Sequence, residues 1–245
     1  MDKGLYISMT GAREALLSQD THANNLANAS TTGFKADYQQ YRSMQVFGSY
    51  YPSRVYAQTE RPGTDMRGGN YMTTGRNLDV AVRGKGWIAV LDAEGKEAFT
   101  RAGDLERDLN GTLVTGSGLA VMGNDGPIVL PEYQKIEVGM DGSISVRALG
   151  EDALGMVEVN RIRLVNPDPK ALEKGEDGLF RMRDGSEPEA SAEVALANGM
   201  LESSNVNPVS ELTSVITSSR LMELNVKMLA TYKENDQVAA RILQA

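Results

Sequence analysis

The stretch that decides the fold of this chain runs from Asn207 to Leu229 and reads NPVSELTSVITSSRLMELNVKML. Asn207 is a suitable N-cap and Pro208 fits the first helical position, so a helix is predicted from Pro208 to about Leu243. Its apolar residues step alternately by three and four positions, a spacing that keeps one side of a helix against a partner helix. This row consists of Leu212, Val215, Ser219, Met222, Val226 and Leu229.

The other end of the chain has the same kind of spacing. A helix is predicted from Gly4 to Asn28, where Ser30, Thr31, Thr32 and Gly33 supply the turn residues that end it. The corresponding row consists of Leu5, Met9, Ala12, Leu16, Gln19, Ala23 and Leu26. Chain ends usually fray, so two patterned ends indicate elements that dock onto something.

The C-terminal helix has more apolar residues than a single helix can cover. Its second row consists of Leu221, Leu224, Met228, Val238 and Ile242. Each large apolar side chain that is buried contributes roughly 1.5–3 kcal/mol, so an uncovered row favours association with other chains. The alternative is an ordinary hairpin in which the two helices of one chain pack only on each other.

The middle of the chain predicts antiparallel β-structure. Short apolar runs such as Trp87–Leu91 and Ile162–Val165 are separated by Asn110-Gly111, Asp141-Gly142 and Gly84-Lys85-Gly86, which suit hairpin turns. Residues 36–75 indicate an extended connector with short strands, and residues 166–200 a loop-rich segment. The fold class is therefore α+β, with a terminal-helix assembly domain (1–35 plus 205–245), a connector (36–75) and a β-rich outer domain (76–204).

Composition excludes several classes of protein. The chain of 245 residues has a net charge of −8, and its two ends are neutral, so the excess negative charge lies in the middle. An acidic middle is unsuited to nucleic acid, and no apolar run is long enough to span a membrane. There is no cysteine and one histidine, His22, so common catalytic triads and zinc sites cannot be built. We expect no catalytic, cofactor-binding or metal-binding residues.

Four stretches together resemble a known family. Residues 23–35 read ANNLANASTTGFK, residues 77–82 NLDVAV, residues 99–104 FTRAGD followed by 110–113 NGTL, and residues 199–206 GMLESSNV. These resemble the signature segments of the bacterial flagellar basal-body rod and hook proteins. Within that family, the length, the Gly63–Met66 segment and the small β-domain are most like proximal-rod members. A distal-rod or hook-related axial subunit is the alternative.

The resemblance implies a structural subunit without catalysis. Its partners would be copies of itself, other rod proteins and the flagellar type III export apparatus, and it would assemble helically in the periplasm. Residues 1–17 lack the pattern of a secretory signal, which is consistent with that route. In this family the terminal helices form an inner tube, and the amides of Asn24, Asn25 and Asn28 would fix register or end the helix.

The resemblance and the two apolar rows together predict an assembly interface. Gly33 would provide backbone freedom and Phe34 an anchor. The interface residues are Leu5, Met9, Leu16, Asn24, Asn25, Leu26, Asn28, Gly33, Phe34, Leu201, Asn205, Val206, Leu212, Val215, Met222, Leu224, Val226, Met228 and Leu229. An enzyme or ligand-binding module that merely dimerises through its helices is the competing class, and stabilisation of the β-rich middle by a ligand would favour it.

Overall fold

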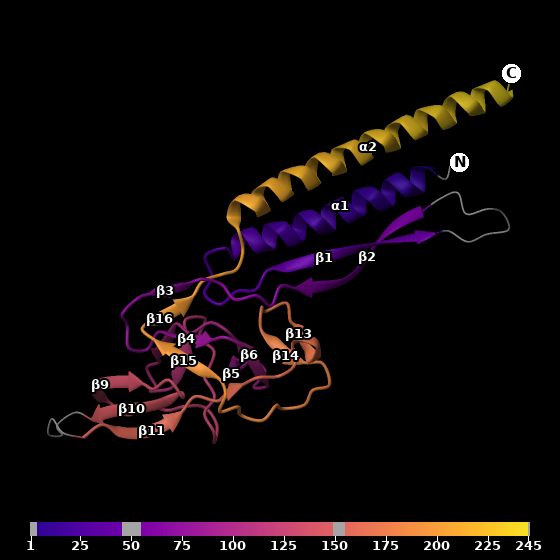
Figure 1. The fold of residues 1–245 in the computed structure, drawn as a ribbon. Helices are drawn as coiled ribbons and strands as arrows, with labels where there is room; N and C mark the ends of the chain where they lie inside the picture. Colours follow the sequence, from indigo (N-terminus) through magenta and orange to yellow (C-terminus); the bar gives the residue numbers. More distant parts are fainter. Residues whose placement is uncertain (1–3, 46–54, 149–154, 245) are drawn as a thin grey trace. The chain divides into compact units, whose positions relative to one another are not determined.

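The computed structural model describes residues 4–45, 55–148 and 155–244 (Figure 1). The chain divides into two compact units. The helix unit comprises Met1–Ala29, Ala36–Asp65 and Val206–Ala245, and the β unit comprises Ser30–Lys35 and Met66–Asn205. The short segment Ser30–Lys35 thus belongs to the β unit, although the residues before and after it belong to the helix unit.

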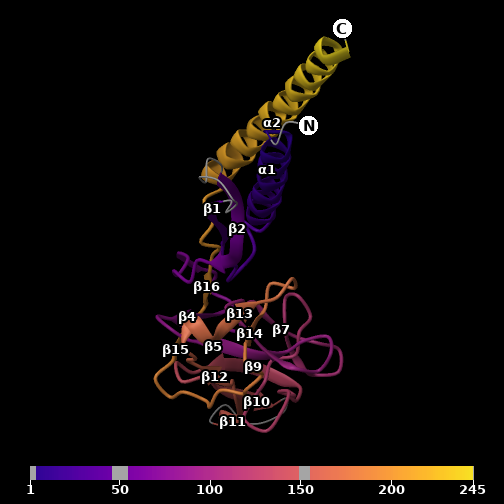
Figure 2. The ribbon, with the colours of Figure 1, turned by 90° about the vertical axis from the view of Figure 1, so that its right-hand side faces the viewer.

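The helix unit contains the two predicted helices. These are α1 (Gly4–Ala27) and α2 (Pro208–Gln244), and they lie side by side in both views (Figures 1 and 2). The predicted start of α2 is confirmed, because the Asn207 side-chain oxygen accepts hydrogen bonds from the amides of Val209 and Ser210 at 3.1 and 3.3 Å. The predicted bounds of both helices agree with the structure to within one residue.

Residues 36–65 differ from the expected connector. They contain two long strands, β1 (Asp37–Gln45) and β2 (Val55–Thr64), which pair antiparallel from Asp37↔Thr64 to Gln45↔Val55 with a bulge at Tyr38/Gln40. The sequence shows no clear alternation of apolar and polar residues here, because tyrosine and polar residues interleave along both strands. Tyr50, Tyr51 and Pro52 of the expected connector lie outside the described residues.

The strands of the β unit pair antiparallel throughout the described residues, which confirms the predicted class. The largest sheet has the order β12-β5-β6-β14-β13, a second has the order β11-β10-β9, and the pairs β15-β4, β16-β3 and β7-β8 complete the unit. The bounds are β3 (Tyr71–Thr73), β4 (Val80–Arg83), β5 (Trp87–Leu91), β6 (Glu97–Thr100), β7 (Leu105–Arg107), β8 (Leu113–Thr115), β9 (Tyr133–Val138), β10 (Ser143–Ala148), β11 (Val157–Arg161), β12 (Leu164–Val165), the 3₁₀ turn η1 (Pro169–Ala171), β13 (Leu172–Lys174), β14 (Phe180–Met182), β15 (Ala195–Asn198) and β16 (Met200–Glu202).

The turn predictions are mostly confirmed. Gly111 and Gly142 have φ of +86° and lie at the ends of the β7–β8 and β9–β10 hairpins. The hairpin expected at Gly84-Lys85-Gly86 is wrong, because β4 pairs with β15 and β5 with β12 and β6, so this turn joins strands of different sheets. Residues 166–200, expected as loops, contain β13, β14 and β15.

The core of the β unit has two parts. The larger cluster is aliphatic and includes Ile88, Val90 and Ile144. The smaller cluster is centred on Trp87 and Phe180, whose ring centroids lie 4.3 Å apart. Trp87 is thus a core residue, as its apolar run predicted. None of the described helices is long and apolar enough to cross a membrane.

Candidate functional site

Small side chains join the two helices of the helix unit. Gly4 lies against the Tyr232 ring and Gly11 against the Asn225 amide, so closely that a Cβ at either glycine would be 2.7 or 2.8 Å from its neighbour. About two helical turns further along α1, the hydroxyls of Ser18 and Ser218 lie 3.2 Å apart. We call the α1 side of this interface the small-residue row; it consists of Gly4, Ser8, Gly11, Ala15 and Ser18.

This arrangement displaces the predicted row of α1 by one residue. The three–four spacing is present, but each contact residue precedes the predicted one, so that Met9 and Leu16 are 53% and 42% exposed. On α2, Val215, Met222 and Leu229 are partly buried, whereas Leu212 and Val226 are exposed. Ser218 and Asn225 contact α1 in place of Ser219 and Val226 of the predicted row. Small residues form the interface between α1 and α2 because they let the two helix backbones approach closely.

The consequence is a large exposed apolar surface on both helices. Large apolar side chains that point away from the small-residue row are not buried by the pairing of α1 with α2. Those more than a third exposed are Tyr6, Met9, Leu16, Leu17, Val209, Leu212, Ile216, Leu221, Leu224, Val226, Met228, Val238 and Ile242. Many large apolar side chains exposed on one pair of helices indicate a surface that binds a partner.

Two polar contacts hold the C-terminal part of α1, one to α2 and one to β1. The His22 ring nitrogen Nδ1 lies 2.5 Å from a Glu211 carboxylate oxygen. Glu211 belongs to the first turn of α2, where the helix dipole favours an acidic group. The buried Asn25 amide donates to the Asp37 carbonyl at 2.8 Å and accepts from the Asp37 amide at 2.9 Å. Asn25 therefore fixes β1 against α1.

A second set of charged residues lies buried in the β unit and forms what we call the anchor cluster: Lys35, Arg101 and Glu202. The Lys35 ammonium lies 2.5 Å from Glu202 Oε1, and Arg101 Nη1 donates to Glu202 Oε2 at 2.9 Å. The side chains of Lys35 and Glu202 are each 1% exposed. A buried charge is tolerated only when it is paired and hydrogen-bonded, and these groups meet that condition.

Backbone groups and an aromatic ring complete the pairing. Lys35 also donates to the Arg67 carbonyl at 2.9 Å, and the Gly69 amide donates to Glu202 at 3.0 Å. Arg101 donates to the Gly84 carbonyl at 2.8 Å, and its guanidinium lies 5.2 Å from the centre of the Trp87 ring. The cluster therefore ties the signature segment near residue 35 to the aromatic part of the core.

Two further residues of the segment Ser30–Lys35 contact the rest of the β unit: Gly33 through its backbone and Phe34 through its aromatic ring. The Gly33 amide donates to the Glu202 carbonyl at 2.8 Å, and Gly33 has φ +68° with the Arg101 backbone 2.2 Å from where a Cβ would be. Only glycine fits that position. The Lys174 ammonium lies 3.9 Å from the centre of the Phe34 ring and donates to the Lys35 carbonyl at 2.8 Å.

Two carboxyl groups near this segment have shifted pKa values of opposite sign. Burial alone would raise the pKa of Glu202, but the hydrogen bond from Lys35 and the positive charge of Arg101 outweigh it and hold the pKa below its ordinary value. Burial raises the pKa of Asp104, although a hydrogen bond with Thr32 acts in the opposite direction. Glu202 is therefore the ionised centre of the anchor.

The predicted interface residues fall into distinct environments. Asn25, Gly33 and Val206 are buried, whereas Met9, Leu16, Asn24, Leu212, Leu224, Val226 and Met228 are exposed. The others are partly buried: Leu5, Leu26, Asn28, Phe34, Leu201, Asn205, Val215, Met222 and Leu229. Asn28 donates to the Asn24 carbonyl at 3.0 Å at the end of α1, a helix-terminating contact.

The anchor cluster was not predicted from the sequence. The sequence offered one sign of it: three of the stretches that resemble the family each contain one member of the cluster, and two of these residues are positively charged and one negatively.

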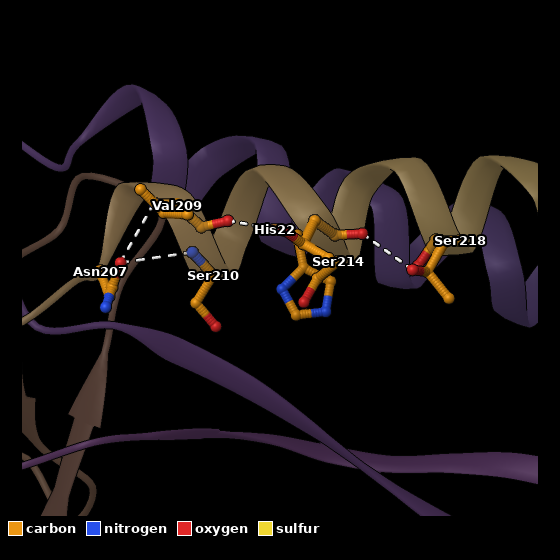
Figure 3. A pocket seen from close by; sticks show the side chains of 8 residues that line it. His22, Asn207, Val209, Ser210, Ser214 and Ser218 are labelled. Carbon is orange, nitrogen blue, oxygen red and sulfur yellow. Dashed lines mark hydrogen bonds between the residues drawn. The ribbon is translucent and has the colours of Figure 1, made fainter.

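A groove of about 530 Å³ was also not predicted; it lies on the helix unit between His22 and small residues of α2 (Figure 3). Within the described ranges, no group of three or more acidic or histidine side chains could hold a metal ion.

Three protein-family models match the chain in separate places. The flagella basal body rod protein family matches residues 5–35, the flagellar hook protein FlgE/F/G D1 domain matches residues 81–146, and the flagellar basal body rod FlgEFG protein C-terminal family matches residues 197–242. Each matched segment contributes one member of the anchor cluster. These matches define the class as the rod and hook proteins of the bacterial flagellum.

Curated relatives narrow the class. The chain is 36% identical to the flagellar basal-body rod protein FlgF of Escherichia coli K12 and 35% identical to that of Salmonella typhimurium, over 99% of both chains in each comparison. It is 30% identical to the rod protein FlgG of Bacillus subtilis over 96% of each chain. The chain therefore belongs to the flagellar basal-body rod protein family.

Proposed function

We propose that this chain is a structural subunit of the flagellar proximal rod that polymerises helically into part of the drive shaft and export channel. The observation that carries the proposal is the exposure of large apolar side chains on α1 and α2, while small residues join the helices to each other. Within the helix unit, no described element covers these side chains, so sister subunits and other rod proteins are their natural partners. Full-length similarity to FlgF supports this assignment.

The helices would form the inner tube, with coiled-coil-like contacts between subunits. Buried apolar side chains contribute roughly 1.5–3 kcal/mol each, so a few residues per neighbour are enough to hold a polymer together. The role requires no catalysis and no cofactor. Delivery through the flagellar type III apparatus to the periplasm, without a cleavable signal peptide, belongs to the same proposal.

The test compares two aspartate substitutions on α2. Leu224→Asp places a charge on the exposed apolar surface, and Thr231→Asp places the same charge at an exposed polar position of the same helix. We expect Leu224→Asp to abolish sedimenting polymer of the concentrated full-length protein and to block motility in a strain lacking its own copy. Thr231→Asp should leave both intact.

Equal polymerisation of the two variants would contradict the proposal that the exposed apolar side chains of α2 bind neighbouring subunits.

A distal-rod or hook-related position is the second candidate, because FlgG proteins match at 30–32% identity. Location of the chain in images of purified basal bodies separates the two positions.

A further inference from the structure

The far end of α2 extends past the first described residue of α1. Gly4, the first described residue of α1, lies against Tyr232, and α2 continues to Gln244 (Figure 1). We call Gln237–Gln244 the C-terminal overhang; it begins more than one helical turn beyond Tyr232. Its Val238 and Ile242 are 53% and 70% exposed and, four residues apart, lie on one face.

The groove lies at the other end of the same helix. It is lined by the His22 ring and by small side chains of α2, and Figure 3 shows Ser210, Ser214 and Ser218 following one another along the helix. These small residues are Ser210, Thr213, Ser214, Thr217 and Ser218. Beside them, Val209, Leu212 and Ile216 form an exposed apolar edge with a spacing of three and four residues.

From these two features we infer that the C-terminal overhang of one copy docks in the groove at the start of α2 of the next copy. This deepens the proposed function and rests on it. Small hydroxyl side chains allow a second helix to approach closely, and the apolar edge matches the apolar face of the overhang. The contact joins different surfaces of the two copies, so it propagates as an open chain instead of closing a dimer.

Electrostatics favours the same pairing. The C-terminal end of a helix carries partial negative charge and its N-terminal end partial positive charge, so the overhang of one α2 suits the first turns of another. The overhang contains one charged residue, Arg241, and the carboxylate next to the groove is Glu211, which binds His22. A second copy of this chain is therefore a chemically matched occupant.

Cysteine cross-linking tests the inference directly, because the chain has no cysteine of its own. In the Ser214→Cys/Val238→Cys variant, the two cysteines lie about 36 Å apart on one helix, so a disulfide between them can form only between copies. We expect oxidation of concentrated full-length protein to produce covalent multimers whose 214–238 junction is identified by mass spectrometry. The matched Leu224→Cys/Val238→Cys variant should show no 224–238 junction.

Sedimentation of the same samples distinguishes failure of the contact between overhang and groove from failure of the proposed assembly function. Polymer that sediments but lacks the 214–238 junction overturns the overhang contact and leaves the assembly function in place. Complete absence of polymer overturns both. As a second measurement, Val238→Asp should cause loss of polymer while the neighbouring Gln237→Asp does not, and equal polymer from both variants also overturns the inference.

Discussion

Glu202 is the residue on which the anchor depends. It accepts hydrogen bonds from Lys35, Arg101 and the Gly69 amide, and its side chain is almost completely buried. Removing one partner of a buried charge pair is costly because the remaining charge is left without compensation. Surface pairs such as Lys96–Glu94, at about 70% exposure, contribute little by comparison.

We predict that Glu202→Gln destabilises the β unit by about 3–5 kcal/mol, since it leaves two buried cations without their anion. Urea unfolding followed by the fluorescence of Trp87, the only tryptophan, measures the change. Glu94→Gln is the control and should leave the transition unchanged. A joint replacement, Lys35→Met with Glu202→Leu and Arg101→Leu, should recover part of the loss if the charge imbalance is its cause.

The pKa of Glu202 gives this loss a pH dependence. Its pKa in the folded chain lies below the ordinary value of 4.5, so its ionised form contributes stability above that pH and loses the contribution as the pH falls through the folded pKa. The difference in unfolding free energy between wild type and Glu202→Gln should therefore shrink as the pH is lowered from 7 to about 3.

Asp104 and Glu97 act in the opposite direction. Burial raises the pKa of both groups, so their contribution to stability falls as the pH rises. Because both residues are present in wild type and in Glu202→Gln, their effect cancels in the difference between the two. A difference that stays constant across the acid range would show that the Glu202 charge is not the source of stability.

At the scale of elements, the pairing of α1 with α2 is set by small residues. The contacts Gly4–Tyr232, Gly11–Asn225 and Ser18–Ser218 keep one antiparallel register along the pair. Large residues on the predicted row would have held the helices further apart. Their displacement by one position turns them toward the outside, where assembly can use them.

A disulfide between the helices tests this register. Ser18→Cys/Ser218→Cys should close within a single copy, because the two hydroxyl oxygens lie 3.2 Å apart. Gln19→Cys/Ser219→Cys, which follows the row expected from the apolar pattern, should not. Mass spectrometry and mobility on a non-reducing gel at low protein concentration read out the result, and the reverse outcome would contradict the structure of the helix pair.

For the whole molecule, the two units differ in what stabilises them. The β unit has its own aliphatic and aromatic core, whereas the helices of the helix unit carry most of their large apolar side chains outside. Helical stability in water comes mainly from packing of an apolar face. The helix ends should therefore open first in an isolated subunit and become ordered on assembly.

Limited proteolysis of dilute full-length protein checks this expectation. We predict early cleavage in α1 and α2 and a resistant fragment that corresponds to the β unit, with its protected region beginning near Met66. Polymerised protein should show protected helices as well. Full protection of α1 and α2 in the dilute monomer would contradict the assembly-dependent ordering.

The sequence by itself determined the helices and their ends, most strands, the antiparallel class and the family. Local chemistry decides these features: the Asn207 cap, the glycines at the turns and the alternation of apolar residues act over a few neighbouring positions. Residues 36–65 and 166–200 were the exceptions. The long strands of the first depend on pairing with each other and on Asn25, and the short strands of the second depend on pairing with each other and with β4.

Only the tertiary structure decided which helix faces meet and which charges become buried. Two rows one residue apart have the same spacing, and close backbone approach selects the row of small residues. Lys35, Arg101 and Glu202 are far apart along the chain, and only the fold places their charges together. Such choices depend on contacts between distant residues, whose free energy no local pattern in the sequence records.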